Sequence, residues 1–231
     1  MLFRSTDTIA KVALPAGRRA IAISAGATHA LAVLDNGDVY AWGLNETGQL
    51  GTGDLVSKAT PTKVTLPRPA VAVAAGRGFS VAALDDGRVY TWGTNSIGQL
   101  GDGGRDAQLS PVQVAGLSGI VAVAAGNSHA LALNAAGRVW AWGANASGQL
   151  GDGRYKASRV PVATPFVEVA RIRAGGDQSA AISRRRALYL WGENGDGQLG
   201  LGTGVDAGVP VAALQGVVEA ATADRFTLAL G

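Results

Sequence analysis

The sequence predicts an all-β protein, a β-propeller of four-stranded blades with four full repeats and a partial fifth. The first observation is a Trp-Gly segment that occurs at Trp42, Trp92, Trp142 and Trp191. Successive tryptophans lie 50, 50 and 49 residues apart, and a constant spacing of this size is typical of repeat architectures. The second observation is that the predicted strands, such as 39–42, are apolar on both faces. Each small sheet therefore needs cover on two sides, which a radial stack of similar sheets supplies.

Each repeat is predicted to contain four strands in the same order, as the second repeat shows. Residues 71–74 alternate larger and smaller apolar side chains, and 79–84 continues extended after a glycine turn. The Asp-Asp-Gly of 85–87 is a hairpin signal, and the strand 88–92 ends in the tryptophan. After a glycine-rich loop, Pro111 begins a short fourth strand, a position at which proline is tolerated.

Four such repeats and a partial one are expected to form a single domain over 1–231. In the four full repeats, a proline always lies 19 residues after the tryptophan. The partial copy stops before its tryptophan strand, and residues 8–14 resemble an outer strand without partners. We therefore expect the N-terminal strand to close the ring as part of a composite fifth blade; an open partial propeller is the alternative. The repeat units are about 20–66, 70–115, 119–163, 167–213, and 217–231 with 8–14.

The glycine-rich loop after each tryptophan is expected to be structural. Gly43, Gly48, Gly51 and Gly53 lie where the chain leaves a strand and folds back, and glycine accepts positive φ there. Leu50 is expected to anchor the loop on the core. A phosphate-binding loop would require a following Lys-Ser/Thr and a helix start, and the sequence has neither.

The amino-acid composition indicates what kind of protein this is. With 47% apolar residues the chain is expected to be globular. It has no cysteine, and so no disulfide framework or thiol chemistry. No run of 18 apolar residues is present, and the first residues do not read as a signal peptide. The expected location is the cytoplasm, and the Ala/Gly/Arg bias suggests a bacterial source.

The net charge of +3 is too small to indicate nucleic acid by itself, but it is unevenly distributed. Residues 154–186 carry eight Arg or Lys against two acidic residues, whereas 187–231 carry one Arg against five. Two basic clusters result, one in a variable loop and one in a hairpin turn, where Arg186 takes the position of a glycine. Each is a candidate for binding an anion or an acidic protein, with a solvated surface as the alternative. Whether they share a rim is left open. The clusters are Arg154, Tyr155, Lys156, Arg159 and Arg184, Arg185, Arg186.

The pattern around each tryptophan closely resembles that of the regulator of chromosome condensation repeat family, and the resemblance covers nearly the whole chain. It implies a propeller of four-stranded blades, usually seven, whereas this chain has about four and a half repeats. It also implies one of several roles, because members include a guanine-nucleotide exchange factor for a Ran-type GTPase, nucleosome binders and interaction scaffolds. A shared fold does not decide between them. The residues that carry the resemblance are Ala25-Gly26-x-x-His29-Ala30-Leu31-Ala32 and Gly37-x-Val39-Tyr40-Ala41-Trp42-Gly43-x-Asn45-x-x-Gly48-Gln49-Leu50-Gly51.

In exchange factors of this family, the residues that matter occupy the loop after each Ala-Gly pair, with Asp or His at its third and fourth places. Only His29, His129 and Asp177 match in type here, and no single loop holds an Asp-His pair. The uniform spacing leaves no room for the projecting hairpin of exchange factors, and the basic N-terminal tail of the founding member is absent. The expected function is a non-enzymatic protein–protein interaction module. GTPase exchange and chromatin or nucleic-acid binding are the alternatives.

The sequence predicts no catalytic or metal site. His29 and His129 begin equivalent strands, but Phe79 holds the same place in another repeat, and acid–base or metal chemistry needs convergent ligands. No HExxH, GxSxG or paired-cysteine motif occurs. We expect no cofactor, and a partner that is another protein, with a small GTPase as one option and self-association if the ring is open. The partner-binding candidates are Arg154, Tyr155, Lys156, Arg159, Arg184, Arg185, Arg186, Asp177, His29 and His129.

Overall fold

The computed structural model describes residues 11–231, which form strands, turns and loops without any helix. The strands make four four-stranded antiparallel sheets and one two-stranded sheet, so the predicted all-β propeller architecture is confirmed.

Each full blade pairs its strands in chain order. The first blade is β1 (Ala20–Ala25), β2 (His29–Leu34), β3 (Val39–Gly43) and β4 (Lys58–Val64). The second is β5 (Ala70–Ala75), β6 (Phe79–Leu84), β7 (Val89–Gly93) and β8 (Gln108–Val114). The third is β9 (Ile120–Ala125), β10 (His129–Asn134), β11 (Val139–Gly143) and β12 (Ser158–Ala163). The fourth is β13 (Val169–Gly175), β14 (Gln178–Ser183), β15 (Leu188–Gly192) and β16 (Ala207–Leu214), and the partial fifth is β17 (Glu219–Thr222) and β18 (Thr227–Leu230).

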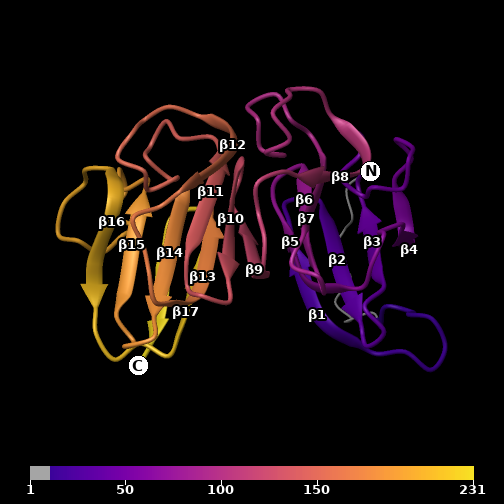
Figure 1. The fold of residues 1–231 in the computed structure, drawn as a ribbon, viewed down its shortest axis with the longest axis horizontal. Helices are drawn as coiled ribbons and strands as arrows, with labels where there is room; N and C mark the ends of the chain where they lie inside the picture. The colour runs from indigo at the N-terminus through magenta and orange to yellow at the C-terminus, as the bar shows by residue number, and fades with distance from the viewer. Residues whose placement is uncertain (1–10) are drawn as a thin grey trace.

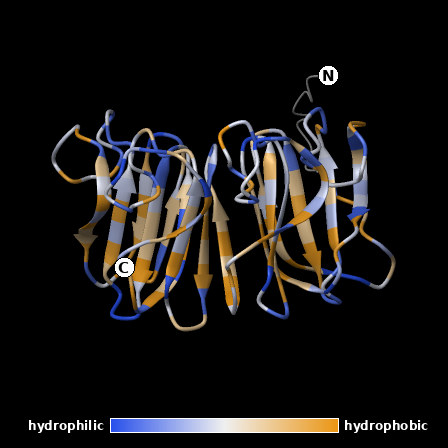
Figure 2. Ribbon diagram, turned by 45° about the horizontal axis from the view of Figure 1, so that its top comes forward, coloured by the Kyte–Doolittle hydropathy of each residue, from blue (hydrophilic) through white to orange (hydrophobic). Residues whose placement is uncertain are grey.

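The blades follow one another across the molecule in chain order, from the N-terminal blade to the C-terminal hairpin (Figure 1). The inner strand of each blade contacts that of the next, β1 with β5, β5 with β9, β9 with β13 and β13 with β17. Hydrophobic residues lie along the strands and hydrophilic residues gather at the loops (Figure 2). The core is therefore divided into layers, one between each pair of neighbouring blades.

The tryptophans fill these layers. Trp92, Trp142 and Trp191 are completely buried, and each packs against the blade that precedes it. Trp92, for example, shares a core cluster with Leu31 and Leu50 of the first blade. Leu50 is fully buried at the base of the glycine-rich loop, as the sequence predicted. Each of these three blades therefore needs the preceding blade to bury its largest side chain.

The hairpin turn between the second and third strands requires a left-handed residue. Gly37 has a φ of 80°, and a Cβ there would lie 2.3 Å from that of Pro69. Arg186 holds the equivalent place in the fourth blade and adopts a φ of 61°. The position of Arg186 in a glycine slot, predicted from the sequence, is confirmed, and it is one of two non-glycine residues with positive φ in the described chain.

The composite fifth blade is not formed in the part of the chain that the structure describes. β17 pairs only with β18, and residues 11–14 belong to no strand; residues 8–10 lie outside the described range. Val12 and Leu14 instead line an apolar cavity of about 360 Å³ with Trp42 on the free face of the first blade. The first blade and the C-terminal hairpin share no ladder because they terminate opposite ends of an incomplete ring. The open partial propeller, the alternative reading of the sequence, therefore describes residues 11–231.

Candidate functional site

Loops leave the blades on two rims, because successive antiparallel strands run in opposite directions. The loops after the first and third strands of each blade form one rim, here the loop rim. The hairpin turns after the second strand, together with the connections between blades, form the opposite turn rim. Arg154, Tyr155 and Lys156 follow β11 and lie on the loop rim, whereas Arg184–Arg186 follow β14 and lie on the turn rim. The two basic clusters therefore do not share a surface.

The turn-rim cluster is tied to its surroundings. Arg184 donates a hydrogen bond to the Ala135 carbonyl at 3.0 Å, and Arg185 lies 3.7 Å from the Glu168 carboxylate. The Arg186 carbonyl accepts from the main chain of Val217. Other arginines and lysines of this rim are matched by carboxylates, so the rim has mixed charge. These ion pairs are Arg18–Asp35, Lys63–Asp38, Arg68–Asp85 and Arg88–Asp86.

The loop-rim cluster is built around Asn145. Its side-chain amide donates to the main-chain carbonyls of Arg154 and Lys156, which draws both carbonyls inward. Tyr155 between them points outward with 56% of its surface exposed. A Cβ added at Gly208 of the next blade would lie only 2.9 Å from the Tyr155 ring, so the ring rests directly on main chain. The aromatic side chain is therefore both exposed and fixed in place. Arg159, the fourth member, is exposed on β12.

Acidic side chains gather on the loop rim beside this cluster. Burial raises the pKa of Asp177, and the nearby charge of Asp224 adds to this effect. A hydrogen bond with the Gln149 side chain lowers the same pKa but does not cancel the rise. Burial, with the charges of Asp177, Asp206, Asp196 and Asp224, also raises the pKa of Glu193. The two charge regions meet where the Tyr155 hydroxyl lies 3.5 Å from the Asp206 carbonyl. A positive and a negative region therefore stand side by side on one rim.

The two histidines are not on the surface. His29 is 4% exposed and His129 is fully buried, and their Nε2 atoms lie 2.8 and 2.9 Å from the hydroxyls of Ser80 and Ser179 on the next blade. Each serine hydroxyl donates its own proton to a main-chain carbonyl, Ser80 to Gln49 and Ser179 to Gln149. The hydroxyl oxygen must therefore accept from the imidazole, which carries its proton on Nε2. Burial lowers the pKa of both histidines to about 4, so both are neutral at pH 7.

The other blades fill the histidine position with matched neighbours. Phe79 occupies it in the second blade, and Ala130 takes the serine place opposite, in the same core cluster. Gln178 occupies it in the fourth blade, accepts from Thr227 at 3.0 Å and donates to the Ala223 carbonyl at 2.8 Å. The residues at this position therefore connect neighbouring blades. Because they are buried, a partner that binds the rim contacts only the exposed candidate residues. The sequence carried a signal for this pairing, because each histidine has a serine about 50 residues later.

Residues 4–231 match the family model of the RCC1-like domain. The chain belongs to the RCC1-like domain family. The crystal structure of human WBSCR16 is similar with a TM-score of 0.86 and 26% identity, over 94% of this chain and 59% of that one. Yeast RCC1 (Prp20), solved bound to Kap60, has a TM-score of 0.81 and 23% identity over 94% of this chain and 55% of that one. A stretch of 48 residues is 46% identical to human E3 ubiquitin-protein ligase HERC2, 21% of this chain and 1% of that protein.

The RCC1-like chain thus spans less than two thirds of these relatives, and the resemblance seen in its repeats is confirmed at the level of family and fold.

A loop-rim groove of about 490 Å³ was not anticipated from the sequence. It runs over the first three blades and is lined by Thr28, Glu46, Arg77, Ile97 and Asn127 among others. Arg77 and Asn127 belong to the short loops after the Ala-Gly pairs, and the Arg77 amide donates to the Asn127 carbonyl at 3.3 Å. The groove is lined by the loops that follow the first and third strands of neighbouring blades, so it forms only when the blades are packed together and no single motif reveals it.

Within residues 11–231, no three His, Cys, Asp or Glu side chains are grouped closely enough to hold a metal ion. The same part of this RCC1-like chain has no helix that could cross a membrane.

Proposed function

We propose that this RCC1-like chain is a non-enzymatic protein-interaction module that binds its partner through the loop rim, with Tyr155 as the anchor. The observation that carries the proposal is that the Tyr155 ring is 56% exposed and yet rests on the main chain of Gly208. Tyr and Arg are enriched among the residues that dominate binding energy. A side chain that is fixed beforehand loses little conformational entropy when a partner covers it.

The charges of the rim favour a partner with a complementary pattern. Arg154, Lys156 and Arg159 are exposed and accept an acidic contact. Glu193 and Asp196 of the adjacent blade favour a basic one. Paired regions of opposite sign steer a partner and fix its orientation more than they add affinity. The proposed partner is therefore a protein with acidic and basic groups side by side, not a uniformly charged polymer.

The non-enzymatic part of the proposal is supported by the position of the two histidines. Both are neutral at pH 7, buried, and engaged with serines across a blade boundary. A general base must reach the proton that it removes, and neither imidazole reaches the rim. Asp177 shares its loop with Gln178 in place of a histidine.

The test is affinity purification with the full chain and three single variants. Tyr155→Ala and Arg154→Glu are expected to weaken capture of a partner, Tyr155→Ala by at least about tenfold. Arg185→Glu on the turn rim is the matched control, because that side chain is also exposed and basic, and it should leave capture unchanged. Loss of the partner with Arg185→Glu but not with Tyr155→Ala would place binding on the wrong rim for this proposal.

Two assays on the same samples address the alternative functions. Accelerated nucleotide release from purified small GTPases would indicate exchange activity and contradict a pure interaction role. DNA binding that weakens steeply with salt would indicate a nucleic-acid partner. We expect neither.

A further inference from the structure

We propose that the turn rim at the third and fourth blades binds an acidic segment of a partner protein through four exposed arginines. They are Arg138, Arg184, Arg185 and Arg186, here the arginine patch. The patch lies on the opposite rim from Tyr155, so this contact is independent of the loop-rim interaction proposed above.

The arginines of the patch come from two neighbouring blades that meet at one place. Arg184 of the fourth blade donates from Nη2 to the Ala135 carbonyl of the third at 3.0 Å. Arg138 lies at the end of that same turn of the third blade. A Cβ added on Gly137 beside it would lie 3.0 Å from the Cα of Glu168, in the connection between the blades. Two hairpin turns and one connection therefore build the patch.

The first observation is that two strained residues lie next to each other here. Glu168 and Arg186 are the two non-glycine residues of the described chain with positive φ, at 59° and 61°. Other blades have glycine at these places, such as Gly119, with a φ of 63°, in place of Glu168. The main-chain contacts are the same, because the Glu168 carbonyl accepts from Arg184 as the Gly119 carbonyl accepts from Ala135. Glycine would serve the turns with less strain, so the charged side chains need another explanation.

Contacts inside the described chain do not supply that explanation for Arg186. Its amide donates to the Ser183 carbonyl and its carbonyl accepts from Val217, both at 2.9 Å and both through main chain. Its side chain is exposed and forms no hydrogen bond or ion pair within residues 11–231. Strained backbone of this kind is concentrated at functional sites. A contact with a partner would use the guanidinium that the turn itself does not need.

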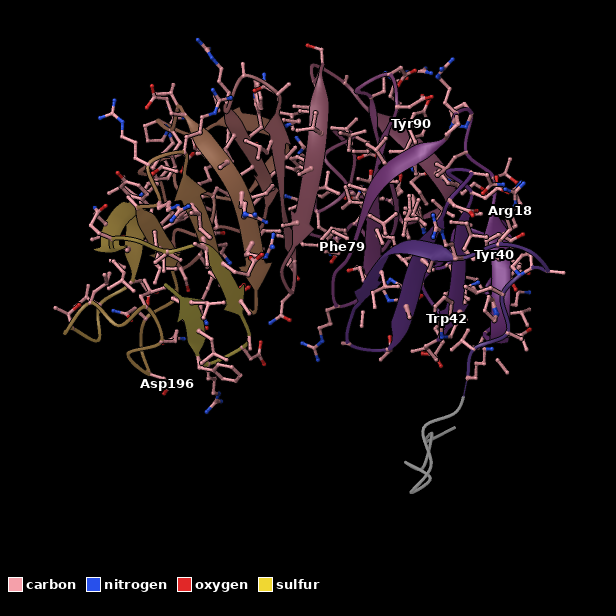
Figure 3. All side chains as sticks on the ribbon, turned by 90° about the horizontal axis from the view of Figure 1, so that it is seen from below. Arg18, Tyr40, Trp42, Phe79, Tyr90 and Asp196 are labelled. Carbon is pink, nitrogen blue, oxygen red and sulfur yellow. The ribbon has the colours of Figure 1, made fainter. Side chains whose placement is uncertain are left out.

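The second observation is that the turn rim is balanced in charge at one end and unbalanced at the other. In the first two blades, each of the four ion-paired cations named above lies 2.7–3.5 Å from a carboxylate. In the described part of the chain, the four arginines of the patch share one carboxylate partner, Glu168, which lies 3.7 Å from Arg185. Arg18, in one of the balanced pairs, lies at the opposite end of the molecule from Asp196 of the fourth blade (Figure 3). Excess positive charge is therefore confined to the patch.

The guanidinium groups keep most of their donors free for a ligand. Arg184 uses Nη2 on the Ala135 carbonyl, and the side chain of Arg185 is 85% exposed. A guanidinium offers five N–H donors in one plane and binds a carboxylate through two parallel hydrogen bonds. One arginine is thus held in place by the protein, while its neighbours are free to close on carboxylates.

The surroundings of the patch favour a short acidic protein segment over a nucleic acid. A phosphate chain that continued along the rim would meet the carboxylates of Asp85 and Asp86 on the turn of the second blade, and like charges repel. Val167, next to Glu168, is 61% exposed and offers an apolar contact. A segment with two carboxylates and an apolar side chain on one face matches these groups.

The experiment uses a fluorescently labelled peptide, Ser-Leu-Ser-Glu-Ser-Glu-Ser-Leu-Ser, added to the full chain. In an extended peptide the glutamates and leucines lie on one face, and the sequence reads the same in both directions. We expect saturable binding by anisotropy that weakens as salt is added. A peptide with glutamine in place of both glutamates should not bind. Failure of the acidic peptide to bind, or equal binding of the glutamine peptide, would overturn the proposal.

Arg186→Gly removes the charge and the backbone strain together. It should weaken peptide binding about threefold to tenfold, whereas the midpoint of chemical denaturation should stay the same or rise. Arg185→Gln should weaken binding to a similar extent without a change in stability. An arginine that is only tolerated in the turn would also leave stability intact on replacement by glycine, but peptide binding would then be unchanged, which would contradict the proposal.

Two control variants and a competitor distinguish this surface from others. Arg68→Gln changes an exposed arginine of the same rim that is paired with Asp85, and it should leave peptide binding unchanged. Tyr155→Ala should also leave it unchanged, although it weakens capture of the loop-rim partner. Peptide binding that is lost in Tyr155→Ala would overturn the proposal. So would a DNA duplex that displaces the peptide and binds more tightly, because the partner would then be a nucleic acid.

Discussion

The indole N–H of Trp92 donates a hydrogen bond to the main-chain carbonyl of Gln49 at 2.9 Å, across the boundary between the first two blades. The same carbonyl accepts from the Ser80 hydroxyl at 2.8 Å, and Ser80 in turn contacts His29. One carbonyl oxygen thus joins the two largest features of the boundary, the buried indole and the histidine–serine pair. The boundary combines apolar burial with paired indole and hydroxyl groups, while the Nδ1 atom of His29 is buried without a hydrogen-bond partner.

Replacing Trp92 with alanine is expected to cost about 3–5 kcal/mol of unfolding free energy, because a fully buried aromatic is removed from the layer between two blades. Chemical denaturation measures the loss. Trp42→Ala is the matched control and should cost less, because Trp42 is only partly buried on the free face of the first blade. A loss below about 1 kcal/mol for Trp92→Ala would contradict the packing described.

His129 is expected to make stability depend on pH. Burial lowers its pKa to about 4 from an ordinary 6.5, so protonation favours the unfolded state. This contribution is fully present above pH 6.5 and is lost as the pH falls from 6.5 toward 4, by roughly 3 kcal/mol. His129→Gln, a residue that the fourth blade uses at this place, removes the contribution of His129 and leaves that of His29, so its pH dependence should be weaker than that of the unmodified protein. Urea unfolding at pH 7.5 and 4.5 compares the two proteins, and parallel pH profiles would show that His129 is not buried in its neutral form.

Gly151 and Gly200 occupy equivalent positions, with and without a tryptophan above them. Alanine at either position strains a left-handed backbone by about 1 kcal/mol. At Gly151 the new Cβ would also lie 2.7 Å from the Trp191 indole nitrogen, which adds an overpacking cost of about 1–3 kcal/mol. Gly151→Ala should therefore destabilise more than Gly200→Ala in chemical denaturation. Equal losses would mean that the Trp191 indole does not crowd a Cβ at position 151.

The C-terminal hairpin is held to the fourth blade in part by Glu219. Its carboxylate lies 2.7 Å from Arg173 and 3.3 Å from Arg171. These groups are about half exposed, so Glu219→Gln should lower global stability by less than about 1 kcal/mol. Hydrogen exchange should nevertheless quicken at 219–222 and stay unchanged in β10, because local opening is more sensitive than global unfolding. Unchanged exchange in both segments would show that the ion pairs contribute nothing to docking.

The repeat pattern was sufficient to predict the blades, the tryptophan layers and even the turn at Arg186, since each rests on local backbone needs repeated at one period. The separation of the basic clusters was left open, although counting strands decides it: one cluster follows the third strand of its blade and the other follows the second. Ring closure could not be read in this way. Closure depends on the rotation between each blade and the one before it. That rotation results from the packing of many side chains, and the sequence of no single strand determines it.

The matched pairs across the blade boundaries have a consequence for how such a protein lengthens by gene duplication. His29 faces Ser80, Phe79 faces Ala130 and His129 faces Ser179, so the first three boundaries are polar, apolar and polar. Copying the second repeat alone would set a phenylalanine against a serine and bury a hydroxyl without its imidazole. Copying the first and second repeats together would set Phe79 against a duplicate of Ala30 and keep each boundary matched. Among the first three repeats, duplication in steps of two therefore keeps the boundaries matched, whereas duplication of one repeat does not.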